Sequence, residues 1–147
     1  MTTTEKNTKT VHMERFFDSS PERLFEAWTK PEILIRWFGC KDTASVKAKI
    51  DLKVGGSFRF EMTGKDGQQH LIIGEYQEIV PASKLVFSMD FTGGCVEEGT
   101  TLVSLTFVGD ERGKTCQTLI HEKLNDEMAE SVDNGWGQSM EKLSKIV

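Results

Sequence analysis

The chain has 147 residues and a net charge of −5, a length that fits one domain better than two. With 37% hydrophobic and 28% charged residues it can bury a core, so disorder throughout the chain is excluded. The lysines are scattered among acidic residues and form no basic stripe, so neither nucleic acid nor an anionic membrane surface is expected as a partner.

The cysteines and the first residues indicate a reducing compartment. Cys40, Cys95 and Cys116 are far apart and lack metal-ligand spacing, which predicts free thiols and no metal site. Residues 1–9 lack the apolar segment of a secretory signal, and no apolar run approaches the roughly 18 residues of a membrane span. We expect a cytoplasmic protein without membrane insertion, with a disordered tail over residues 1–9 and one domain over residues 10–147.

The first third of that domain predicts one strand and two short helices. Apolar and polar residues alternate over residues 10–17, as in a strand. Residues 20–22 (Ser-Pro-Glu) supply a cap, a first-turn proline and an acidic residue for the start of a helix. Residues 31–32 (Pro-Glu) begin a second helix, which Gly39 ends.

The hydrophobic period then changes from 3.6 to 2, which predicts six more strands. They are expected over residues 44–51, 58–62, 69–80, 85–91, 103–107 and 114–122. Residues 93–99 are interpreted as a flexible loop because of their glycines.

The end of the chain predicts a long helix, from about residue 125 to residue 147. Its apolar stripe includes Trp136 and Met140. Gly135 and Gly137 flank Trp136 although glycine disfavours helices, and close approach to the sheet or a local kink would explain them.

These elements predict an α+β fold in which a curved seven-stranded antiparallel sheet surrounds the C-terminal helix. A helix of about 10–12 Å diameter is narrower than such a sheet, so either large side chains fill the remaining space or a hollow for an apolar ligand persists. The expected lining is mostly large and apolar: Trp37, Phe38, Phe58, Phe60, Met62, Ile72, Tyr76, Phe87, Met89, Leu105, Phe107, Gln117, Leu119, His121, Trp136 and Met140.

Several stretches resemble a known family in combination and in order. They are SPERLFEAWT (20–29), PE (31–32), RWFG (36–39), VGGSFRF (54–60), GEYQEIVP (74–81), LVF (85–87), HE (121–122) and GW (135–136), with Met140 and Leu143. Over about residues 10–147 the chain is similar to proteins homologous to the C-terminal domain of the activator of the heat-shock-protein-90 ATPase. That family belongs to the START-like superfamily, also called SRPBCC or birch-pollen-allergen-like.

The resemblance implies the helix-grip (START-like) fold and, as in superfamily members that carry lipids, a small apolar or amphipathic ligand. No cofactor is implied. The co-chaperone itself has an additional N-terminal domain with no counterpart here, so a chaperone partner is not expected. Two positions depart from the family pattern: Lys30 stands where a capping Asp is common, and Gln117 replaces an aliphatic residue. An exposed sheet edge would permit a homodimer.

The candidate chemistry centres on His121, which shares a strand face with Gln117 and Leu119. A buried neutral histidine needs a hydrogen-bond partner, from a helix, a loop or a ligand. The main hypothesis is non-enzymatic binding or sensing of a hydrophobic ligand in an internal cavity. One alternative is a cyclase or hydrolase that uses His121, with Glu61 and Glu75 as the other acid–base candidates; another is a co-chaperone-like protein-binding module.

Three further residues each have two interpretations. Tyr76 either donates a hydrogen bond to a ligand or packs under the sheet. The aromatic pair Trp37 and Phe38, at the end of the second short helix, either controls entry to the cavity or fills the space between helix and sheet.

Overall fold

The computed structural model describes residues 9–39, 42–92, 100–124 and 126–147. It contains strands β1 (Lys9–Phe17), β2 (Thr43–Ile50), β3 (Ser57–Gly64), β4 (Gln69–Val80), β5 (Lys84–Thr92), β6 (Thr100–Gly109) and β7 (Thr115–Leu124), and helices α1 (Pro21–Thr29), α2 (Pro31–Leu34) and α3 (Asp126–Ser144). The predicted order of elements is confirmed. The predicted tail over residues 1–9 is wrong at Lys9, which pairs with β7 as the first residue of β1. The rest of that prediction, the 93–99 loop, Cys40 and Cys95 lie outside the described residues.

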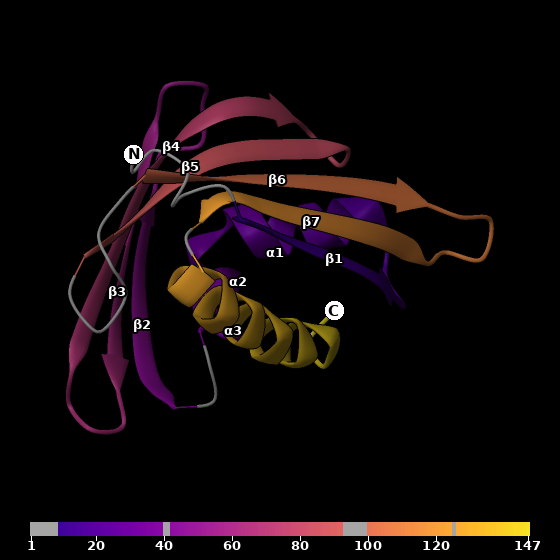
Figure 1. Cartoon of the computed structure of the whole chain (residues 1–147). Helices are drawn as coiled ribbons and strands as arrows, with labels where there is room; N and C mark the ends of the chain where they lie inside the picture. The colour runs from indigo at the N-terminus through magenta and orange to yellow at the C-terminus, as the bar shows by residue number, and fades with distance from the viewer. Residues whose placement is uncertain (1–8, 40–41, 93–99, 125) are drawn as a thin grey trace.

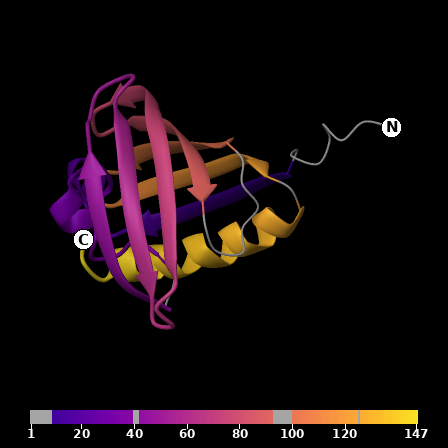
Figure 2. The ribbon, with the colours of Figure 1, turned by 90° about the vertical axis from the view of Figure 1, so that its left-hand side faces the viewer.

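The seven strands form one sheet in the order β1-β7-β6-β5-β4-β3-β2, and every neighbouring pair is antiparallel. The sheet bends around α3, with α1 and α2 behind α3 in the view of Figure 1. Helix α3 runs alongside β1, as Figure 2 shows from the side of β2 and β3. The predicted α+β helix-grip fold is confirmed, whereas the homodimer remains a prediction.

The two short helices differ in how firmly they begin. In α1, the Ser20 hydroxyl accepts a hydrogen bond from the Arg23 N–H at 3.2 Å, which satisfies one of the free amides of the first turn. Helix α2 has four residues, and its N-cap, Lys30, makes no side-chain capping bond. Helix α2 therefore begins without the side-chain cap that an Asp at position 30 would supply, and it depends on its packing contacts.

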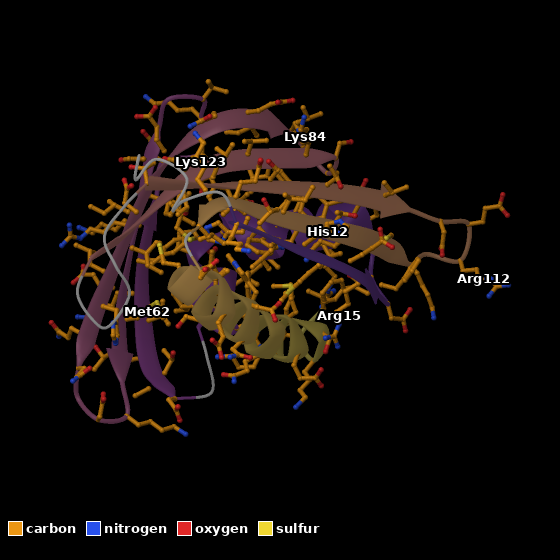
Figure 3. The ribbon with its side chains drawn as sticks, in the orientation of Figure 1. His12, Arg15, Met62, Lys84, Arg112 and Lys123 are labelled. Carbon is orange, nitrogen blue, oxygen red and sulfur yellow. The ribbon has the colours of Figure 1, made fainter. Side chains whose placement is uncertain are left out.

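The core lies between the concave face of the sheet and the three helices. Its buried aromatic rings touch in a continuous series from Trp37 through Trp28 to Trp136, with centroids 4.7 Å and 5.5 Å apart, and from Phe38 through Phe60 to Phe58, at 4.9 Å and 4.7 Å. Charged groups stay at the periphery, where Arg15 of β1 reaches Glu141 of α3 at 3.0 Å (Figure 3).

Three peripheral observations bear on the expectations from sequence. Cys116 is half-buried and unpaired, in agreement with the predicted free thiol. Among the described residues, no three His, Cys, Asp or Glu side chains gather closely enough to hold a metal ion. In the same part of the chain, no helix is both long enough and apolar enough to cross a membrane.

The glycine of β4 and the two glycines of α3 differ in how much space surrounds them. A methyl group on Gly74 of β4 would collide with the Ser88 carbonyl oxygen and the Phe58 ring, so only glycine fits there. Methyl groups on Gly135 and Gly137 of α3 would meet no atom within 4 Å. The expectation that close approach to the sheet explains these two glycines is therefore wrong, because both Cα atoms face open space.

We expect Gly74→Ala to lower the free energy of unfolding by about 2 kcal/mol or more, because the added methyl overlaps fixed neighbours. Gly135→Ala should raise it by about 0.5–1 kcal/mol, since alanine favours the helix and has room. Urea unfolding of both variants measures the difference. Equal effects would contradict this account of Gly74.

Candidate functional site

A small apolar cavity lies between the two short helices and the middle strands of the sheet. Its volume is about 10 Å³, close to the space that one water molecule occupies. Helices α1 and α2 and the turn after them contribute one wall, and β3, β4 and β5 contribute the other. The lining residues are Trp28, Leu34, Phe38, Phe58, Phe60, Tyr76, Leu85, Phe87 and Met89.

This cavity corrects the expectation of a ligand-sized hollow at these residues. That expectation treated α3 as the only cover of the sheet, but the cavity has no lining residue from α3. Trp28, Leu34 and Phe38 instead project from the α1–α2 region, are buried, and line the cavity opposite β3 to β5. Large side chains, the other arrangement that the sequence permits, therefore occupy the concavity in this conformation.

The structure brings most of the predicted lining residues into one core. Six of them border the cavity, namely Phe38, Phe58, Phe60, Tyr76, Phe87 and Met89. Others are buried elsewhere in the same core: Trp37, Ile72, Leu105, Phe107, Gln117, Leu119, His121, Trp136 and Met140. Met62 of β3 is half-buried and packs against the core (Figure 3).

The lining also includes three residues that were not predicted from the sequence: Trp28, Leu34 and Leu85. Trp28 and Leu34 lie on the buried stripes of the two short helices, and Leu85 shares its strand parity with Phe87. Those patterns predict burial but do not distinguish a cavity wall from packed core.

His121 is fully buried and belongs to a hydrogen-bonded chain across three strands and a helix. The Trp136 indole N–H donates to His121 Nδ1 at 3.0 Å. His121 Nε2 lies 2.6 Å from the Thr101 hydroxyl, which donates to the Met89 carbonyl at 2.8 Å. Because an indole only donates, Nδ1 must accept, so the imidazole proton resides on Nε2 and points to Thr101.

Gln117 makes a second polar connection on the same face of β7. Its Oε1 accepts the Trp28 indole N–H at 2.8 Å, and its Nε2 donates to the Met140 sulfur at 3.1 Å. Gln117 is 1% exposed and His121 is 0% exposed. The predicted inward direction of both side chains is confirmed, and both are hydrogen-bonded to helix side chains.

These contacts weaken the catalytic role considered for His121. Burial lowers the pKa of His121 to about 3, and both ring nitrogens are already engaged. Glu61 and Glu75 are exposed on the other side of the sheet, where Glu61 pairs with Arg59. The three acid–base candidates therefore do not converge on the cavity.

Contacts with neighbouring residues restrain both the ring and the backbone of Tyr76. Its side chain is 2% exposed, with the Phe58 ring at 5.5 Å and the Phe87 ring at 6.1 Å. The Gly55 N–H donates to the Tyr76 carbonyl at 2.8 Å, and the Tyr76 N–H donates to the Gly56 carbonyl at 2.9 Å. Burial raises the pKa of Tyr76, which keeps the phenol protonated.

The segment around α2 closes the cavity and is tied down at its end. Trp37 is fully buried, and its indole donates to the Ala27 carbonyl at 3.0 Å. The Gly39 N–H donates to the Ser139 hydroxyl at 3.1 Å, and that hydroxyl donates to the Gly39 carbonyl at 3.0 Å. In this conformation Trp37 and Phe38 fill the space between helix and sheet.

Sequence reasoning also missed Thr101 and Ser139, the polar partners of this region. Thr101 has the inward parity of Val103 and Leu105, but that strand was predicted to start later. Ser139 lies next to Met140 on the helical stripe. A search for partners of the inward His121 would have found Thr101, whereas Ser139 bonds the Gly39 backbone, and that contact depends on how α3 docks.

We expect Thr101→Val to lower the free energy of unfolding by about 1–3 kcal/mol, because the buried His121 N–H loses its acceptor. Thr106→Val is the matched control on the outer face of β6 and should change stability by less than about 0.5 kcal/mol. Chemical denaturation compares the two variants. Similar losses would argue against the hydrogen-bonded chain.

Stability should also depend on pH through His121. Its ordinary pKa is 6.5 and its folded pKa about 3, so the unfolded chain binds the extra proton between these values. The contribution of His121 to the free energy of unfolding is therefore fully present above pH 6.5. Below that pH the free energy of unfolding falls, by about 2–3 kcal/mol between pH 7.5 and pH 4.5.

The test compares His121→Gln with His12→Gln, which changes an exposed histidine of β1. Denaturation at both pH values should show that the wild-type chain and His12→Gln lose stability in parallel. The His121→Gln chain should lose about 2–3 kcal/mol less. An unchanged pH dependence in His121→Gln would refute the assignment.

Residues 18–147 match the family described as Activator of Hsp90 ATPase homolog 1-like protein. No curated protein matches the chain significantly. Several solved structures share the fold. A Chromobacterium violaceum protein has a TM-score of 0.83 at 25% identity, over 94% of this chain and 96% of that one.

Two more solved structures share the fold of this chain. The AHSA1 protein of Silicibacter pomeroyi gives a TM-score of 0.79 at 24% identity, over 93% of this chain and 96% of that chain. An Arthrobacter aurescens protein gives 0.77 at 24% identity, over 96% and 86%. The resemblance drawn from the sequence is confirmed, and the chain belongs to the family of Activator of Hsp90 ATPase homolog 1-like proteins.

Proposed function

We propose that the protein binds a small apolar ligand, without catalysis, in the space between the α1–α2 region and strands β3 to β5. The observation that carries the proposal is the aromatic cavity beneath the weakly capped helix α2. Family membership supports a ligand-binding or co-chaperone-like fold in general. The engaged nitrogens of His121 remove the main support for the cyclase or hydrolase alternative.

Binding requires the cavity to expand. A cavity of about 150 Å³ accommodates benzene, far more than the present 10 Å³. The residues that must move are Leu34 and Phe38, which lie on the α2 side of the cavity. Displacing each into water costs about 2–3 kcal/mol, which the ligand must offset by its own burial. We therefore expect weak to moderate affinity.

The α2 segment, residues 30–39, is the part of the wall best suited to move. Helix α2 is too short to be stable alone, and Lys30 gives it no side-chain cap. The opposite wall consists of β3, β4 and β5, whose backbones are paired on both sides within the sheet. Opening on the α2 side breaks fewer backbone hydrogen bonds than opening the sheet.

The test uses indole and toluene as probes, with ligand-observed NMR and thermal unfolding. Both probes should bind the wild-type chain and raise its Tm by a few degrees at saturating concentration. Leu34→Ala should bind at least about fivefold more tightly, because it removes part of the closing wall. Ile35→Ala, an exposed neighbour, is the control and should match the wild type.

A wild-type chain that binds neither probe would contradict the proposal. Binding of both probes by Leu34→Ala would not rescue it in that case, because the mutation itself would then have created the site.

A further inference from the structure

We infer that the ligand is electrically neutral and carries one hydrogen-bond acceptor, which the Tyr76 hydroxyl recognises. This inference rests on the proposed function and makes Tyr76 the residue that determines specificity. It follows from which polar groups reach the cavity, which of them are already engaged, and where the charges of the protein lie.

The nine lining side chains carry no charge. Apart from the weakly accepting Met89 sulfur, their polar groups are the Trp28 indole N–H and the Tyr76 hydroxyl. The indole N–H is committed to Gln117 at 2.8 Å, which leaves the hydroxyl for a ligand. A phenol donates readily to a carbonyl or ether oxygen.

Tyr76 presents this hydroxyl from a fixed position. The flanking Phe58 and Phe87 rings and the backbone bonds to Gly55 and Gly56 restrain the side chain and its strand. A donor held in advance loses little conformational entropy when a ligand binds. Because the phenol stays protonated, it offers a donor at every physiological pH.

The interior offers nothing that would neutralise an anionic ligand. Within the described part of the chain, the buried polar residues are Ser19, Thr29, Thr101, Thr115, Gln117, His121 and Ser139, with no Lys or Arg among them. His121 is neutral, and its nitrogens face Trp136 and Thr101. A carboxylate moved into this space would lose its hydration without gaining a counter-ion.

The experiment compares three probes of similar shape at pH 7.5: 2-acetylnaphthalene, 2-ethylnaphthalene and 2-naphthoate. Affinities are measured by fluorescence or ligand-observed NMR. The ketone should bind about 5–20-fold more tightly than the hydrocarbon, consistent with one added hydrogen bond. The carboxylate should bind at least about 100-fold more weakly than the ketone.

Tyr76→Phe is the matched variant because it keeps the ring and removes only the hydroxyl. It should reduce affinity for the ketone about 5–20-fold and leave affinity for the hydrocarbon within about twofold. Equal losses for both probes would overturn the role of the hydroxyl.

The remaining outcomes separate this inference from the proposed function. Binding of 2-naphthoate as tight as that of the ketone would overturn neutral selectivity while leaving ligand binding in place. Failure of all three probes in a wild-type chain that binds indole or toluene would overturn this inference alone, whereas failure of all five probes would overturn both proposals.

Discussion

Two polar side chains on the concave face of β7 accept hydrogen bonds from indole N–H groups of the helices that cover it. Gln117 accepts from Trp28 of α1, and His121 accepts from Trp136 of α3. A buried indole without an acceptor costs free energy, whereas packing alone tolerates many orientations of a helix. These two hydrogen bonds therefore fix where α1 and α3 lie on the sheet, and the Trp28–Trp136 contact follows from them.

The same arrangement determines the chemical character of the interior. The hydrogen-bonding capacity of β7 is used to hold helices, so these residues present little to a ligand. Charges remain outside: the ion pairs of the described residues join partly or largely exposed side chains. What remains between α2 and β3 to β5 is an aromatic space with Tyr76 among its lining residues.

Sequence patterns predicted the elements whose signals are local. The cap at Ser20, the alternation over β3 and the inward direction of Gln117 and His121 all follow from neighbours a few residues apart. The bounds of β4 and the burial of Ile72 and Tyr76 were predicted, but both faces of the strand are partly apolar because its pairing with β5 shifts between Tyr76 and Glu78, which changes which residues face inward. Residues Ile72 and Tyr76 face the core before the shift, and Ile79 is half-buried after it.

The interior volume could not be predicted in this way. Periodicity shows that Phe58 or Trp28 is buried, but the free space between them depends on how the short helices dock, and that is a long-range property. The glycines of α3 are a second case in which the sequence did not predict the surroundings of a residue. Gly135 and Gly137 suggested a packing constraint, yet their surroundings are open, and nothing in the structure explains them.

The paired hydrogen bonds between Ser139 and Gly39 have a mechanical consequence. They fasten the end of the α2 segment to the third helix, so neither cover of the core can shift without pulling on the other. The same helix carries Glu141, which pairs with Arg15 of the first strand, so these contacts link the α2 segment, α3 and β1 in series.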